Sequence, residues 1–225
     1  MTVDVVEYAA GRQMDVHGAA TTGAVLLWHG SNPDERAVLR PLAGRAARAG
    51  LLVMVPDWDS TRDDRGRSQL LASWEHARTV AARHLGTDQR LVVAGWSLGG
   101  TAAAALALTG GVPSRRAVTF AGAFLEPDPV TGTPPLDLAR AGEQAELWIT
   151  HGTEDDVVDV AEAAVFADRL ASLGHVAHLH EAHTDHVGIV GCMHAEGGQA
   201  CVPGDTAGAR AGLALAVDVL VAATS

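Results

Sequence analysis

The chain has 225 residues, of which 48% are hydrophobic, a formal net charge of −11 and a pI near 5.3. This acidic balance argues against nucleic acid and anionic membranes as partners. No uninterrupted apolar stretch is long enough for a membrane span, and the acidic start does not resemble a signal peptide. We expect one cytoplasmic domain over residues 1–225. All 16 basic residues are Arg, which excludes the Schiff-base and phosphate-loop chemistry that needs Lys.

Apolar strand-like runs alternate with helical patterns along the chain. The first two segments, 2–7 and 13–17, predict a hairpin at the sheet edge. The patterns predict further strands at 24–28, 51–55, 90–94, 117–121, 147–150 and 176–181. They predict helices at 34–49, 68–85, 101–108, 160–172 and 205–223, and an irregular excursion with a short helix over 122–144. This alternation is typical of a parallel sheet with helices on both faces.

The segment Gly95-Trp96-Ser97-Leu98-Gly99 lies between the strand at 90–94 and the helix at 101–108. A Gly-x-Ser-x-Gly pattern at such a junction predicts a nucleophile elbow, a sharp turn that exposes the serine hydroxyl. Glycines without Cβ let the strand and the helix approach each other closely. The first N–H groups of the helix point into the same space and can stabilise an anionic oxygen. Ser97 is therefore the candidate nucleophile.

A neutral serine needs a base, and the base needs an orienting carboxylate. Three carboxylates, Glu154, Asp155 and Asp156, follow the predicted strand at 147–150. Two histidines, His183 and His186, follow the last predicted strand. The order serine, acid, histidine is the one found when a nucleophile elbow works with a triad. The residues alone leave open which carboxylate and which histidine take part.

With these motifs the chain resembles the α/β-hydrolase superfamily, in particular small serine esterases without a large lid, from about residue 24 to the terminal helix. The resemblance implies an α/β-hydrolase fold and cleavage of carboxylic esters through a covalent acyl-enzyme. The family's His-Gly-x-x-Asp-x-x-Val segment, found at 151–158, implies Asp155 as the acid, with Asp156 as the alternative. The family's base follows the last strand, which implies His186, with His183 as the alternative.

The segment Trp28-His29-Gly30-Ser31 resembles the family's oxyanion loop. The resemblance implies that the N–H groups of Ser31 (or Gly30) and Leu98 stabilise the oxyanion. Ser31 stands where the family often has glycine, which leaves the donor open between Ser31 and Gly30. We expect Gly30, Trp58 and Trp96 to lie at the substrate site.

The sequence predicts no cofactor and no metal, because the spacing of Cys192, Cys201 and the late histidines matches no standard zinc pattern. The two cysteines are expected to be reduced, although a local disulfide is geometrically plausible in an oxidising environment. The expected partner is a small-molecule ester, and the oligomeric state is left open. A peptidase, a thioesterase or an acyltransferase with the same triad is the alternative, and a catalytically silent binding module is less favoured.

Overall fold

The computed structural model describes residues 3–113, 115–141, 144–194 and 201–225. Its centre is an eight-stranded sheet in the order β1-β2-β4-β3-β5-β6-β7-β8. The strands are β1 (Val3–Ala9), β2 (Arg12–His17), β3 (Gly23–Trp28), β4 (Leu51–Pro56), β5 (Leu91–Trp96), β6 (Arg116–Phe120), β7 (Glu146–Gly152) and β8 (Val176–Ala182). The β1–β2 hairpin joins β4 in antiparallel pairing, and all the other neighbours pair in parallel.

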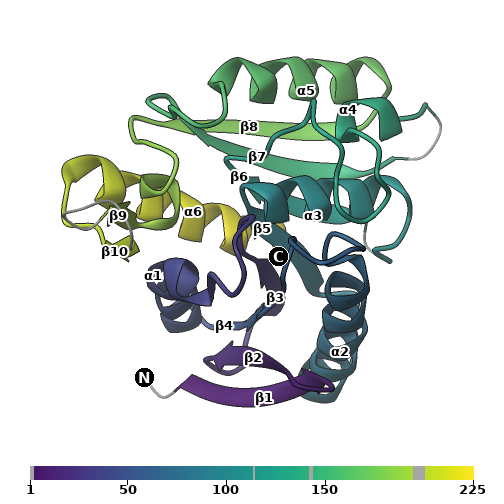
Figure 1. Cartoon of the computed structure of the whole chain (residues 1–225), viewed down its shortest axis with the longest axis vertical. Coiled ribbons are helices and arrows are strands. Elements are labelled where there is room, and N and C mark those ends of the chain that lie inside the picture. Colours follow the sequence, from purple (N-terminus) through teal and green to yellow (C-terminus); the bar gives the residue numbers. More distant parts are fainter. Residues whose placement is uncertain (1–2, 114, 142–143, 195–200) are drawn as a thin grey trace.

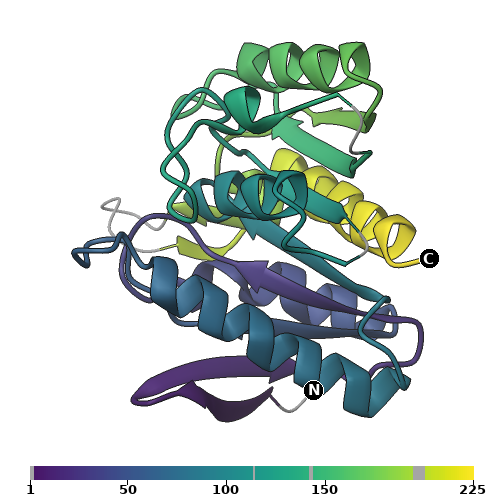
Figure 2. The same cartoon turned by 90° about the vertical axis from the view of Figure 1, so that its right-hand side faces the viewer.

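Helices cover both faces of this sheet (Figure 1). One face carries α1 (Arg36–Arg48) and α6 (Ala207–Ala223), and the other carries α2 (Arg67–Leu85), α3 (Leu98–Leu108) and α5 (Val160–Ser172). The short helix α4 (Pro135–Leu138) interrupts the excursion after β6. Figure 2 shows the same layers from the side. No helix among the described residues is both long and apolar enough to span a bilayer.

The sheet separates two apolar cores, and its central strands contribute to both. Along β3, Leu26 and Trp28 pack with α2 and α3, whereas Val25 and Leu27 pack with α1 and α6. Every residue of β3, β4 and β5 is buried. Burial on both faces explains why these strands are continuous apolar runs in the sequence.

The structure confirms the predicted mostly parallel sheet with helices on both faces, and it adds a small hairpin. The predicted helix at 160–172 matches α5. Its N-cap is Asp159, whose side chain accepts a hydrogen bond from the Ala161 N–H. A 3₁₀ helix, η1 (Gly188–Val190), and the hairpin strands β9 (Cys192–His194) and β10 (Cys201–Pro203) lie where the sequence suggested only a loop. Strands of three residues are too short to show an alternating pattern.

Candidate active site

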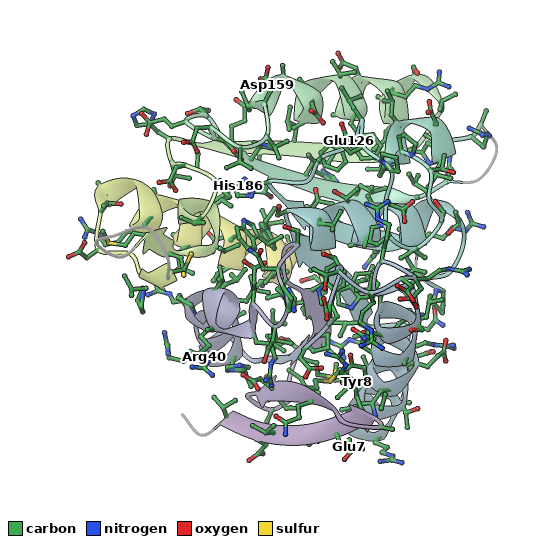
Figure 3. The ribbon with its side chains drawn as sticks, viewed as in Figure 1. Glu7, Tyr8, Arg40, Glu126, Asp159 and His186 are labelled. Atoms are coloured by element: carbon green, nitrogen blue, oxygen red, sulfur yellow. The ribbon has the colours of Figure 1, made fainter. Side chains whose placement is uncertain are left out.

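The candidate catalytic residues follow three strands of the sheet at the same edge. Ser97 comes directly after β5, Asp155 lies in the loop after β7, and His186 lies in the loop after β8. Because these strands run in parallel, their carboxyl ends meet at one edge, where ligands bind in open α/β sheets. In Figure 3 His186 lies in the half of the molecule that also holds Asp159 and α5, whereas Tyr8 lies toward the opposite end of the sheet.

The turn at Ser97 is held by backbone geometry. Ser97 has φ 54° and ψ −127°, a conformation that a non-glycine residue adopts only when its surroundings impose it. A Cβ on Gly95 would lie 2.2 Å from the carbonyl carbon of Gly99, and a Cβ on Gly99 would lie 2.3 Å from the carbonyl oxygen of His29. The elbow therefore requires glycine at both positions.

Ser97 also sits at the start of a helix. Its N–H donates to the carbonyl of Phe120 at 2.8 Å, and its carbonyl accepts from the N–H groups of Gly100 and Thr101. The N–H of Leu98, the first residue of α3, has no acceptor within the helix, as in any helix start. This arrangement leaves an N–H donor next to the half-buried Ser97.

The carboxylate of Asp155 has no exposed side-chain surface, and four nitrogen atoms lie within contact distance of its two oxygens. Its Oδ1 accepts from the N–H groups of Val157 and Val158, both at 2.9 Å. Its Oδ2 lies 2.8 Å from Nδ1 of His186 and 3.1 Å from Nε2 of His151. Burial raises the pKa of the Asp155 carboxyl, but the hydrogen bonds from His151, His186 and Val158 outweigh it and hold the pKa well below its usual range. Asp155 is therefore ionised at neutral pH.

His186 is almost completely buried and is fixed in one tautomer. An ionised carboxylate only accepts hydrogen bonds, so Nδ1 of His186 carries the proton and Nε2 keeps its lone pair. The indole N–H of Trp96 donates to the carbonyl of His186 at 2.8 Å, and the two rings lie 5.1 Å apart. Trp96, which directly precedes Ser97, therefore links the strand of Ser97 to His186. No hydrogen bond joins Ser97 to His186 among the described residues, and such bonds often tighten only when substrate is bound.

The two alternative residues lie outside this pair. The side chain of His183 is 82% exposed, and its nearest carboxylate is the exposed Glu154 at 3.4 Å. Asp156 is exposed as well. Of the candidates that the sequence left open, the structure brings together Asp155 and His186.

The side chain of His29 supports the candidate oxyanion loop around Gly30 and Ser31. Nδ1 of His29 donates to the carbonyl of Gly30 at 3.1 Å, and Nε2 accepts from the N–H of Trp58 at 3.3 Å. Complete burial lowers the pKa of His29 to about 4, which keeps the ring neutral. Gly30 is buried, and a Cβ there would lie 2.9 Å from the Trp96 ring. Ser31 is exposed at the surface of the loop.

The two tryptophans differ from the expectation that they face substrate. Trp58 has no exposed surface, because its indole stacks on His29 at 5.3 Å within the core that carries α2 and α3. Trp96 is 5% exposed and acts through its hydrogen bond to His186. Both rings therefore support the loops of the site. His151 was missed in the sequence, although it begins the same motif that pointed to Asp155.

A pocket of about 250 Å³ opens beside His186. It is lined by Glu154, Asp156, Val157, Asp185, His186 and Val187. A larger hollow lies on the loop that includes Asp59 and Arg62, and none of the candidate catalytic residues lines it.

Neither a metal cluster nor a disulfide forms in the described part of the chain. There, no group of three or more His, Cys, Asp or Glu residues is arranged to hold a metal ion. Cys192 and Cys201 are both free thiols, and Cys192 Sγ donates to the carbonyl of Val38 at 3.0 Å.

The mostly parallel eight-stranded sheet, with helices on both faces and a serine elbow after β5, defines an α/β-hydrolase fold. Among solved structures the chain is similar to esterase 2 of Thermogutta terrifontis phosphorylated by paraoxon. The two are 20% identical with a TM-score of 0.74, and the match covers 98% of this chain and 94% of that chain. The same esterase with butyrate bound matches at 20% identity and a TM-score of 0.72, with the same coverage. No model of a known protein family and no curated protein matches the sequence.

Proposed function

We propose that this protein is a serine hydrolase that cleaves carboxylic esters, and that residues 1–225 form its one catalytic domain. The observation that carries the proposal is the 2.8 Å hydrogen bond between buried Asp155 and His186, which Trp96 ties to the strand of the nucleophile. A base held in one tautomer and a serine in a strained turn, linked through Trp96, are the parts that acyl transfer needs.

In the proposed reaction, Nε2 of His186 takes the proton of Ser97 while Oγ forms a bond to the ester carbonyl carbon. The carbonyl electron pair moves onto its oxygen, and the N–H groups of Leu98 and Ser31 (or Gly30) stabilise that charge. The tetrahedral intermediate then expels the alcohol, which receives the proton from His186. Water attacks the acyl-enzyme with His186 again as base, and the carboxylic acid leaves. Asp155 stays ionised throughout and stabilises the imidazolium.

The proposed substrates are small esters with short acyl chains. The similar esterase from Thermogutta terrifontis is described with propionate bound, with butyrate bound and phosphorylated by paraoxon. The short acids bound to that esterase favour acyl chains of a few carbons here as well.

Turnover of 4-nitrophenyl acetate, butyrate and octanoate tests the proposal. We expect the wild-type protein to hydrolyse the two short esters faster than the octanoate, and Ser97→Ala to abolish turnover. Ser172→Ala, an exposed serine on α5, is the matched control and should keep full activity. Paraoxon should add one phosphoryl group to Ser97, detected by mass spectrometry of the digested protein. Full turnover in Ser97→Ala would refute the assignment.

A further inference from the structure

His151, the penultimate residue of β7, contacts the candidate acid but has no part in the mechanism so far. Its side chain is fully buried. Its Nε2 lies 3.1 Å from Oδ2 of Asp155 and 3.1 Å from the carbonyl oxygen of Val158. Two imidazoles, those of His151 and His186, therefore converge on one carboxylate oxygen.

The neighbours of His151 determine where its proton lies. The carboxylate and the carbonyl only accept hydrogen bonds, so Nε2 carries a proton and shares it between them. Nδ1 is buried and has no partner among the described residues. A proton on this second nitrogen would leave a buried donor of a charged ring unpaired, which is strongly unfavourable. His151 is therefore a neutral donor through Nε2.

We propose that His151 is a positioning residue that holds the Asp155 carboxylate in its plane and shares Oδ2 with His186. The proposal rests on the proposed serine hydrolase mechanism, in which Asp155 orients His186. Two backbone N–H groups fix Oδ1, and the two imidazoles fix Oδ2, so that all the acceptor sites of the carboxylate are used.

His151 also stabilises the loop that carries Asp155. Val158, whose carbonyl accepts from His151, directly precedes the N-cap Asp159 of α5. The N–H of the same Val158 donates to Asp155. One imidazole on a rigid strand thus holds both the carboxylate and the end of its loop.

Sharing Oδ2 has an electrostatic consequence for the base. A carboxylate oxygen that accepts from two donors attracts each of them less strongly than an oxygen that accepts from one. Without His151, Oδ2 would accept a single, stronger hydrogen bond from Nδ1 of His186. Glu154 and Asp156 from the loop of Asp155 and Asp185 from the loop of His186 also face the base. These carboxylates are present in the wild-type protein and in every His151 variant, so their electrostatic effect on His186 cancels when the variants are compared.

The test compares His151→Leu, which has no donor, with His151→Gln, whose amide N–H can replace Nε2. We expect His151→Leu to lower kcat by about 10- to 100-fold with KM within about twofold, because a misplaced catalytic group slows the chemical step. The acidic limb of the kcat/KM profile should move to higher pH. His151→Gln should restore most of kcat and the position of the limb.

The control is His175→Leu at another buried histidine, which immediately precedes β8 at the end of the strand away from His186. It should lower the melting temperature without moving the acidic limb. An unmoved limb in His151→Leu, or a glutamine variant no better than the leucine variant, would overturn the proposal.

A readout without turnover separates this proposal from the proposed function. The Nδ1 proton of His186, shared with a carboxylate, should give a downfield proton NMR signal that disappears in His186→Gln. We expect this signal to shift in His151→Leu and to return in His151→Gln, whatever substrate the protein uses. A signal unchanged by His151→Leu would contradict the positioning role, whereas missing ester turnover beside a shifted signal would contradict only the esterase assignment.

Discussion

The two sides of the candidate site are stabilised by different forces. Ser97 is held by steric contacts, because the glycines around it let two backbones approach so closely that no other conformation fits. Asp155 and His186 lie on loops and are held by hydrogen bonds between ionisable side chains. Steric contacts do not depend on pH, whereas these hydrogen bonds do. We therefore expect the nucleophile side to tolerate acid and the acid–base side to be sensitive to it.

The largest expected effect comes from removing the charge of the acid. Asp155→Asn keeps the shape of the side chain but presents an amide group to Nδ1 of His186, which favours the wrong tautomer. In serine hydrolases this change lowers kcat by about 10⁴-fold, and we expect a loss of 10³-fold or more in ester turnover. Asp156→Asn, the exposed neighbour, should stay within about twofold. Equal losses in both variants would show that the wrong carboxylate has been assigned.

The second effect tests the steric side through folding stability. Gly95→Ala places a Cβ 2.2 Å from the Gly99 carbonyl carbon and should destabilise the fold by about 3 kcal/mol or more in urea unfolding. Gly44→Ala is the matched control, because the nearest atom to a Cβ there is 3.9 Å away and the residue lies within α1. A helical glycine replaced by alanine should leave stability unchanged or raise it slightly. A stable Gly95→Ala protein would argue against the close approach of strand and helix.

The third prediction concerns a source of acid sensitivity outside the Asp155–His186 pair, the buried His29 that supports the candidate oxyanion loop. Burial lowers the pKa of His29 from 6.5 to about 4, so the unfolded chain binds this proton more readily than the folded chain. The stability that neutral His29 contributes is complete above pH 6.5 and is lost as the pH falls toward 4, by about 3 kcal/mol at most. The depressed pKa of Asp155 adds a further loss once the pH falls below its ordinary 3.8.

The measurement is urea unfolding of the wild-type protein and His29→Gln at pH 7.5, 6, 5 and 4. The glutamine amide can still accept from the Trp58 N–H but does not titrate. We expect the difference in unfolding free energy between the two proteins to change over this range in the direction that favours His29→Gln in acid. Parallel curves would contradict the assignment of this titration to His29.

The smallest expected effect is that of the alternative base. The side chain of His183 is exposed and lies outside the buried pair, so His183→Ala should change kcat/KM by less than about twofold. His186→Ala is the comparison and should lower turnover almost as far as Ser97→Ala, because the triad acts as a unit. A large loss in His183→Ala, with activity kept in His186→Ala, would reverse the choice of base.

The same contrast explains which features could be predicted from the sequence. The elbow is local: five consecutive residues between a strand and a helix define it, so the pattern around Ser97 was sufficient. The choice between Asp155 and Asp156 depends on which side chain turns inward, and adjacent carboxylates look alike in a sequence. His151 was missed because its partner is a carboxylate oxygen already assigned to another histidine. Trp58 was misplaced because an aromatic residue after a strand can stack inward as readily as it can line a pocket.

The hydrogen bond from Trp96 to the carbonyl of His186 joins residues 90 positions apart in the chain. Trp96 belongs to the central strand β5, which is buried throughout, whereas His186 belongs to a connecting loop. If the loop of His186 moves away from β5, this hydrogen bond must break before His186 can separate from Ser97. Breaking a buried hydrogen bond costs about 1 kcal/mol. Amide hydrogen exchange in the His186 loop should therefore report how often His186 moves away from Ser97.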